Sequence, residues 1–292
     1  TDNNANISNG SFTDSVTDLT ANRTVDSIID YFGEDVGVTY ETIDSITYTV
    51  YTLDTEKEIT ENTGLSIENN VIFDGNNKTI TYSGSDAWEG LFRPASGADS
   101  SNKITFQIRN INFVLNGANV AERGGCILGT SNDGTTAYDN FIVDIENCHT
   151  SGTGVIGNYA GGICGGSFGR SNSGGSITNC SNSLAIGGSG MNEAGGISGT
   201  YTQVDISYCW NTGSINGIGS GGICGSNVTS SCEIKYCYNT GNITTANSGG
   251  ICGKQAREVT IFNCALRLTY IFNYHDSLYL ILIKFQCFRF FN

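Results

Sequence analysis

Short apolar segments of three or four residues, separated by Gly, Asn and Ser, recur through the middle of the chain. No apolar spacing in this region follows a helical period over about ten residues, so the pattern favours short strands joined by tight turns. Thirty of the 39 glycines fall between residues 121 and 253, and none follows Gly253. The short strands and turns therefore form a repeat region that is confined to the middle of the chain.

Two motifs alternate within the repeat. The first is Gly-Gly-Ile-Cys-Gly, with Ser198 in place of Cys in one copy. Its copies occupy residues 161–165, 195–199, 221–225 and 249–253, after a degenerate copy at 124–129. The second motif, Ile-x-x-Cys, ends at Cys148, Cys180, Cys209, Cys237 and Cys264. These five cysteines lie 32, 29, 28 and 27 residues apart, so the two motifs share one period.

A fixed period of about 20–50 residues is typical of solenoids, propellers and arrays. A unit of roughly 28 residues is too short for a propeller blade of about 40–45, and it fits one coil of a parallel β-helix. Equivalent residues of stacked coils lie about 4.8 Å apart. We therefore predict inward ladders of Ile and Cys, corners of Gly and Asn, and few charges.

The glycine motifs, together with Cys-Tyr-Asn-Thr-Gly at residues 237–241, resemble the GLUG-type repeat, whose core is Gly-Gly-Leu-x-Gly. The resemblance covers about residues 124–264, with Ile in place of the family's Leu. It implies a right-handed parallel β-helix similar to the pectin-lyase-like fold, in a large secreted or surface-attached protein such as an adhesin. The matched residues are core and turn residues, so they specify an architecture and no ligand.

The segment before the repeats continues the same pattern. Residues 65–67, 71–77 and 79–81 resemble the opening coils of pectin-lyase-like helices, and two more strands are predicted before residue 115. We therefore predict one all-β domain, a right-handed parallel β-helix solenoid, over residues 45–264.

An amphipathic helix is predicted over residues 24–32, because Val25, Ile28, Ile29 and Phe32 have i, i+3, i+4, i+7 spacing. An open β-helix end exposes unpaired strands and an apolar core. We expect this helix, within the acidic segment 1–44, to cap that end. The alternative is an isolated helix in an acidic linker.

The segment 265–292 lacks Gly and abandons the repeat. It contains two strongly apolar runs, at residues 266–272 and 278–283. Three interpretations stay open: a C-terminal cap, a segment that contacts a partner or a membrane surface, and an aberrant reading frame.

Composition narrows the classes of partner. The chain has 292 residues, with 14 basic and 28 acidic side chains and a net charge of −14. Phosphate binding needs clustered Lys and Arg, so this charge argues against nucleic acid. No apolar run reaches about 18 residues, so no membrane-spanning helix is predicted.

Eleven cysteines, an odd number, leave at least one thiol unpaired within the chain. Free Cys packs as a small hydrophobe, and Ser198 within one ladder favours packing over bonding. Stacked Cα atoms also lie within disulfide range, so isolated bridges between coils stay open. Cys232 and Cys287 have no place in either ladder.

One acidic cluster is a candidate for the paired carboxylates that glycan-cleaving enzymes use as acid and base. It consists of Asp133, Asp139, Asp144 and Glu146, with Arg123 or Arg170 as a basic partner. A solvated outer face is the favoured interpretation, because residues 147–253 add only Glu193, Asp205 and Glu233.

Other catalytic and metal patterns are weaker still. Cys148 and His149 are neighbours, and neighbours in a strand point to opposite faces. Cys232 and Cys237 do not have the spacing of a zinc site. We predict no catalytic residue, no cofactor and no metal.

We therefore predict a non-catalytic structural or adhesive module of the cell surface or extracellular space, with carbohydrate or a cell-surface molecule as its partner. Binding is expected to use outward ladders. The polar pairs are Asn211/Asn239 and Thr212/Thr240, and the aromatic pairs Tyr208/Tyr236 and Trp210/Tyr238 can stack on sugar rings, although packing is favoured.

Two alternative functions stay open. One is a polysaccharide lyase or glycoside hydrolase that uses Asp139, Asp144 and Glu146 with an Arg. The other is a trimeric viral fibre or tailspike-like element on a virion surface. The sequence leaves the oligomeric state undetermined.

Overall fold

The computed structural model describes residues 23–33, 36–67, 69–94, 103–129, 140–169, 174–228, 232–257 and 259–266, with side chains of the helix from residue 28. As predicted, this part of the chain is nearly all β, with one helix, α3 (Arg23–Phe32). The strands are β1 (Val36–Ile43), β2 (Ile46–Leu53), β3 (Lys57–Ile59), β4 (Leu65–Ile67), β5 (Val71–Asp74), β6 (Thr79–Tyr82), β7 (Phe92–Pro94), β8 (Ile104–Leu115), β9 (Phe141–Gly152), β10 (Val155–Ile156), β11 (Gly174–Thr178), β12 (Ser181–Asn182), β13 (Ala185–Ile186), β14 (Asp205–Ser207), β15 (Trp210–Asn211), β16 (Glu233–Lys235), β17 (Tyr238–Asn239), β18 (Thr260–Phe262) and β19 (Ala265–Leu266).

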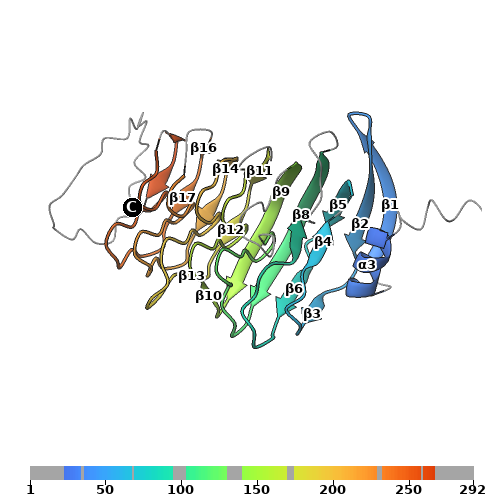
Figure 1. The fold of residues 1–292 in the computed structure, drawn as a ribbon, viewed down its shortest axis with the longest axis horizontal. Coiled ribbons are helices and arrows are strands. Elements are labelled where there is room, and N and C mark those ends of the chain that lie inside the picture. The colour runs from blue at the N-terminus through green and yellow to red at the C-terminus, as the bar shows by residue number, and fades with distance from the viewer. Residues whose placement is uncertain are drawn as a thin grey trace, which may run out of the picture.

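Most strands lie side by side in one large sheet that runs along the long axis (Figure 1). Along the path β2-β5-β8-β9-β11-β14-β16-β18, every neighbouring pair is parallel. A second parallel row runs from β9 through β12, β15 and β17 to β19. Single parallel bridges link the glycine motifs, Gly161 to Gly195 and Gly221 to Gly249 among them. Each repeat thus pairs with the equivalent residues of the repeat before it.

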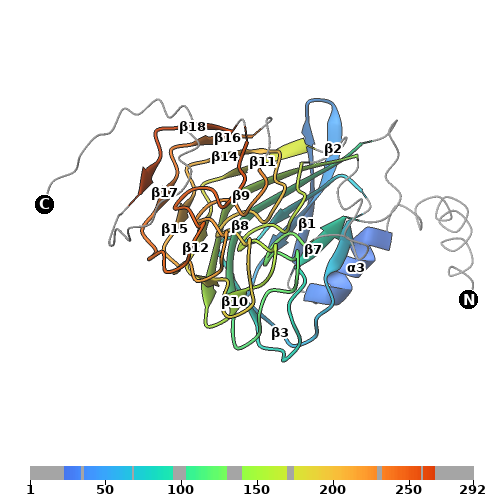
Figure 2. The ribbon, with the colours of Figure 1, turned by 60° about the vertical axis from the view of Figure 1, so that its left-hand side comes forward.

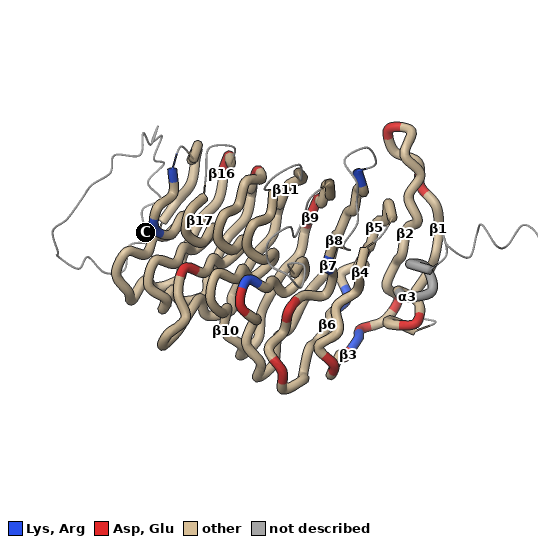
Figure 3. The backbone as a smooth tube through the Cα atoms, in the orientation of Figure 1, with Lys and Arg blue, Asp and Glu red and all other residues tan. Residues whose placement is uncertain are grey.

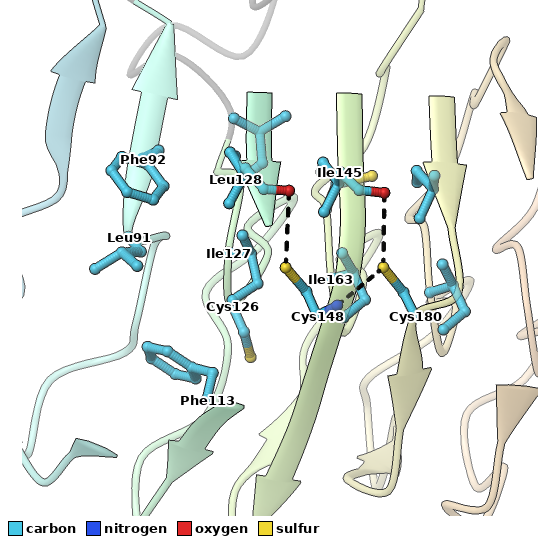
Figure 4. Packing of buried hydrophobic residues seen from close by; sticks show 14 of the residues in the cluster. Leu91, Phe92, Phe113, Cys126, Ile127, Leu128, Ile145, Cys148, Ile163 and Cys180 are labelled. Carbon is cyan, nitrogen blue, oxygen red and sulfur yellow. Dashed lines mark hydrogen bonds between the residues drawn. The ribbon is translucent and has the colours of Figure 1, made fainter. Parts of the chain in front are cut away.

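Equivalent side chains form continuous columns inside the molecule. One column consists of Phe73, Ile108, Ile145, Ile177, Ile206, Ile234 and Ile261. Another consists of Leu65, Phe92, Leu128, Cys164, Ser198, Cys224 and Cys252. Figure 4 shows the middle of the core, where the rings of Phe92 and Phe113 lie on one side and the thiols of Cys148 and Cys180 on the other. The predicted inward ladders of Ile and Cys are confirmed.

The register corrects one detail of the repeat. Gly125 bridges Gly161 and Leu128 bridges Cys164, so the first copy of the glycine motif begins at Gly125 and not at residue 124. Cys126 therefore lies outside the cysteine column. It is buried, and its carbonyl accepts a hydrogen bond from Nε1 of Trp88 at 3.0 Å.

The N-terminal end holds a strand that the sequence analysis did not predict. β1 pairs with β2 in an antiparallel hairpin, and its turn residues Asp44 and Ser45 have φ of 49° and 68°. Two consecutive positive φ values are typical of a type I′ turn. The predicted domain boundary at residues 44–45 falls on this turn.

Helix α3 lies beside the same end of the sheet (Figure 1). Ile28 and Phe32 are buried, and the Phe32 ring lies 5.0 Å from the ring of Phe73. Among the described residues, no helix has the length and apolarity needed to cross a membrane.

The corner after β5 is held by the carboxylate of Asp74. It accepts hydrogen bonds from the backbone N–H of Asn76 at 2.8 Å and from Asn110 Nδ2 and Arg109 Nε, both at 2.9 Å. Burial raises the pKa of Asp74, but these three donors outweigh it and hold the pKa below its usual value. The ionised carboxylate therefore stabilises the folded state.

We expect Asp74→Asn to lower the free energy of unfolding by about 1–2 kcal/mol at pH 7, because charge-assisted hydrogen bonds are lost. A depressed pKa contributes stability above the unfolded value of about 3.9, and that contribution disappears as pH falls through the folded pKa. Urea unfolding of both proteins from pH 7 to pH 3 measures this. The difference should shrink below about pH 4, and a constant difference would contradict the assignment.

Candidate binding site on the aromatic face

One corner column crosses the sheet, within the long strands β8 and β9 and between the two short strands of each later repeat. In the order of stacking it consists of Asn110, Asn147, Asn179, Tyr208, Tyr236 and Asn263. All six have φ between 49° and 59°. Asn tolerates this left-handed conformation better than other non-glycine residues. The corner explains why Asn recurs there.

The Asn members of this column also bond to one another. Asn147 Nδ2 donates to Asn110 Oδ1 at 2.8 Å, and Asn179 Nδ2 donates to Asn147 Oδ1 at 3.2 Å. Tyr208 and Tyr236 interrupt this amide ladder. A bulky side chain at positive φ is an outlier, and such strain concentrates at functional sites.

Four rings project from two consecutive coils and form the surface that we call the aromatic face: Tyr208, Trp210, Tyr236 and Tyr238. Tyr208 stacks on Tyr236 with ring centroids 4.9 Å apart and an interplanar angle of 10°. Trp210 stacks on Tyr238 at 6.0 Å and 6°. The three tyrosines are 55%, 42% and 41% exposed, in chain order. The aromatic pairs therefore lie outside, as predicted, and pack on each other.

The side chains on the N-terminal side of the aromatic face are short and polar. Asn179 lies beside Tyr208 in the corner column, and Ser181 pairs with Trp210 in the strand row. Ser181 Oγ lies 2.8 Å from Nδ1 of His149, whose ring lies 5.5 Å from that of Trp210. Figure 2 shows β12, β15 and β17 side by side here. Short polar side chains therefore replace the rings of Tyr208 and Trp210 at the equivalent positions of the coil that carries β12.

The order Ser181, His149, Asn147 resembles a nucleophile, a base and an orienting group, since His149 Nε2 lies 3.2 Å from Asn147 Oδ1. Acyl transfer also needs free donors for an oxyanion. The N–H groups of Asn179 and Ser183 already donate to carbonyls at 3.0 and 2.9 Å, and that of Cys180 donates to a thiol. This arrangement therefore suits binding better than acyl transfer.

The prediction that the Asn and Thr pairs form outward polar ladders was only half correct. Thr212 and Thr240 are exposed, as predicted, but Asn211 and Asn239 are buried. Asn182 Nδ2 donates to Asn211 Oδ1 at 2.8 Å, and Asn211 Nδ2 donates to Asn239 Oδ1 at 2.7 Å. The prediction was wrong because each buried amide hydrogen-bonds to the equivalent amide of the next coil. These bonds offset the cost of removing the amide from water.

The acidic cluster does not assemble into a catalytic pair among the described residues. Asp144 is half-buried and accepts a hydrogen bond from Ser176 Oγ at 2.7 Å, while Glu146 is exposed. Arg123 lies over the ring of Tyr159, 5.0 Å from its centroid. The remaining members, Asp133, Asp139 and Arg170, lie outside the described residues. In the part of the chain that the structure describes, no three His, Cys, Asp or Glu side chains are grouped for a metal ion.

The cysteines of the ladders are free thiols, and most of them are buried. All ten cysteines in the described ranges are free, and eight of them are buried. Cys148 is buried and His149 is half-buried on the opposite face, as predicted. Cys232, which had no predicted place, lies within hydrogen-bonding reach of the Cys224 thiol. Burial raises the pKa of Cys164 to about 12, and a thiol in that state is a poor nucleophile.

No family model matches the chain, and no curated protein matches it. The resemblance to GLUG-type repeats therefore rests on the motifs alone. A solved structure, described as a "putative immunoglobulin A1 protease from Bacteroides ovatus", is similar with a TM-score of 0.53 and 21% identity, over 75% of this chain and 68% of that chain. This likeness concerns the fold.

A second solved structure, named IgA1 Protease, has a TM-score of 0.41 and 14% identity to this chain. The match covers 74% of this chain and 20% of that chain. This chain therefore spans about a fifth of that protein's length.

Proposed function

We propose that this chain is a non-catalytic structural or adhesive module of the extracellular space, built as a right-handed parallel β-helix. Residues 45–264 form the helix in this proposal, and 124–264 are its regular coils. In this proposal helix α3 caps the N-terminal end, and the burial of its Ile28 and Phe32 side chains supports that role. The segment 265–292 follows as a cap or tail, and its residues 267–292 lie outside the described part of the chain.

The observation that carries this proposal is that the residues of the two repeated motifs serve packing and turn geometry. The Ile and Cys of the motifs are buried in columns, and the Asn211 column is buried as well. An added Cβ on Gly161, Gly195 or Gly221 would come closer than 3.0 Å to backbone atoms. Packing and turn geometry repeat from coil to coil, while the outward side chains repeat only in pairs such as Tyr208/Tyr236 and change elsewhere, as from Asn179 to Tyr208. A protein that presents a variable surface on a regular frame has this organisation.

Two considerations support an extracellular location. The motifs resemble those of secreted and surface-attached repeat proteins. The fold resembles that of a protein named for a protease of immunoglobulin A1.

The distribution of charge supports the stacked architecture. Lys, Arg, Asp and Glu are sparse on the C-terminal coils (Figure 3), and this suits a stacked frame because like charges in adjacent coils repel.

The test compares binding with turnover. We expect the purified chain, coupled to beads, to retain glycans or cell-surface glycoproteins while the solution gains no new reducing ends and no cleaved immunoglobulin A1. Product formation that is lost in Asp144→Asn would replace the proposal with a lyase or hydrolase. Peptide cleavage that is lost in Ser181→Ala would replace it with a peptidase. A threefold mass in light scattering would favour the viral fibre.

A further inference from the structure

We propose that the aromatic face binds a neutral glycan, with one sugar ring stacked on the open face of Tyr208 above the coil that carries β12. This inference rests on the proposed function, since it names the ligand class and the subsite of the outward surface.

The first step concerns the open end of the aromatic column. Tyr236 covers one face of the Tyr208 ring at 4.9 Å. On the other side, the next member of the column is Asn179, and Tyr208 is the most exposed ring of the aromatic face. Among the described residues, no second ring covers that face. A flat ring placed there, over the shorter side chain of Asn179, would continue the stack.

The second step concerns the polar groups beside that position. The His149 imidazole and the Ser181 hydroxyl hold each other at 2.8 Å, and Asn179 is tied to Asn147. These side chains are therefore oriented before any ligand arrives. Both ring nitrogens of His149 are already engaged, so Ser181 Oγ and the Asn179 amide are the groups with capacity left for a ligand. A pyranose has C–H groups on its face, which suit an aromatic π-system, and hydroxyls around its rim, which suit these two side chains.

The third step concerns backbone strain. Asn stands at four of the other five positions of this column and has a similar positive φ, so the corner itself does not need a ring. A Tyr at φ of 55° is retained against its conformational preference. Tyr159 and Tyr201 also have positive φ, so the feature that distinguishes Tyr208 is an exposed ring at a corner where Asn recurs.

The fourth step concerns charge. Asp205 is exposed on the strand that leads to Tyr208, and Glu233 is paired with Lys235 in the next coil. The exposed Asp205 carboxylate would repel an acidic sugar at close range, whereas a neutral hexose or N-acetylhexosamine would not be repelled.

The experiment titrates the protein with neutral hexose and N-acetylhexosamine oligosaccharides and follows binding by calorimetry and tryptophan fluorescence. Trp210 reports on the site, because Trp88 is fully buried. We expect Tyr208→Asn to weaken binding about tenfold, a plausible value for losing one aromatic stack. The melting temperature should stay close to that of the parent, since Asn fits this corner. Tyr40→Asn, which removes an exposed ring at the far end of the molecule, should leave affinity unchanged.

Each other outcome overturns the inference. If the parent binds none of these oligosaccharides, or binds only acidic ones, the neutral subsite is wrong, while the absence of turnover still supports the proposed function. Equal affinity in Tyr208→Asn and the parent would place the ligand elsewhere. Release of cleaved oligosaccharides by the parent would instead contradict the proposed function.

Discussion

Gly195→Ala is expected to lower the free energy of unfolding by about 3 kcal/mol or more, enough to threaten folding of a marginally stable domain. An added Cβ would lie closer than 3.0 Å to the carbonyl oxygen of Ser198 and to the backbone N of Gly225. Both are backbone atoms that also bond to the neighbouring coil. Relief of the clash would therefore require a shift between two coils. Urea unfolding followed by far-UV circular dichroism measures the loss.

Gly174→Ala is the matched control, because a Cβ at Gly174 meets no atom within 4 Å and its φ is not in the left-handed region. Its stability should stay the same or rise slightly, since alanine restricts the unfolded chain more than glycine does. Equal losses in the two variants would show that close approach between coils is not the reason for glycine in the motif.

Asn211→Ala is expected to cost about 3–5 kcal/mol, because it leaves several buried polar groups without partners. The Asn211 amide bonds to Asn182, to Asn239 and to both backbone groups of Gly213. The side chain is fully buried, so water does not replace these bonds without opening the coils. Thermal unfolding of the variant measures the effect.

Thr240→Ala serves as the control for this second variant. Thr240 follows Asn239 and is exposed, so its loss should change stability by less than about 0.5 kcal/mol. Similar small effects in both variants would mean that the amide column contributes little to the fold.

The repeat period and the inward Ile and Cys were predictable, because both depend on local alternation and on spacing along the chain. The inward Asn211 and Asn239 were not. A polar residue beside a Gly-rich turn favours solvent when it is considered alone. Burial becomes favourable only when an identical amide lies one coil away. That partner is about 28 residues distant in sequence and becomes a neighbour only when the coils stack.

The candidate site also combines features that the sequence predicts with features that it does not. The exposed Tyr and Trp pairs were expected from their spacing, since equivalent positions in two coils must stack. The positive φ of Tyr208 and Tyr236 could not be predicted from the sequence. Only the strand register shows that these two tyrosines occupy the corner position that Asn occupies in the other repeats. His149 and Ser181 lie 32 residues apart in sequence and meet through pairing of β9 with β12.

The sequence by itself determined that this protein is nearly all β, that it repeats with a near-constant period, and that small apolar side chains point inward. These properties follow from residue types and their spacing. Only the tertiary structure decided the register of the first glycine motif, the burial of the amide column and the open face of Tyr208. The physical reason is that hydrogen bonds and ring stacking between coils join residues that are far apart in sequence.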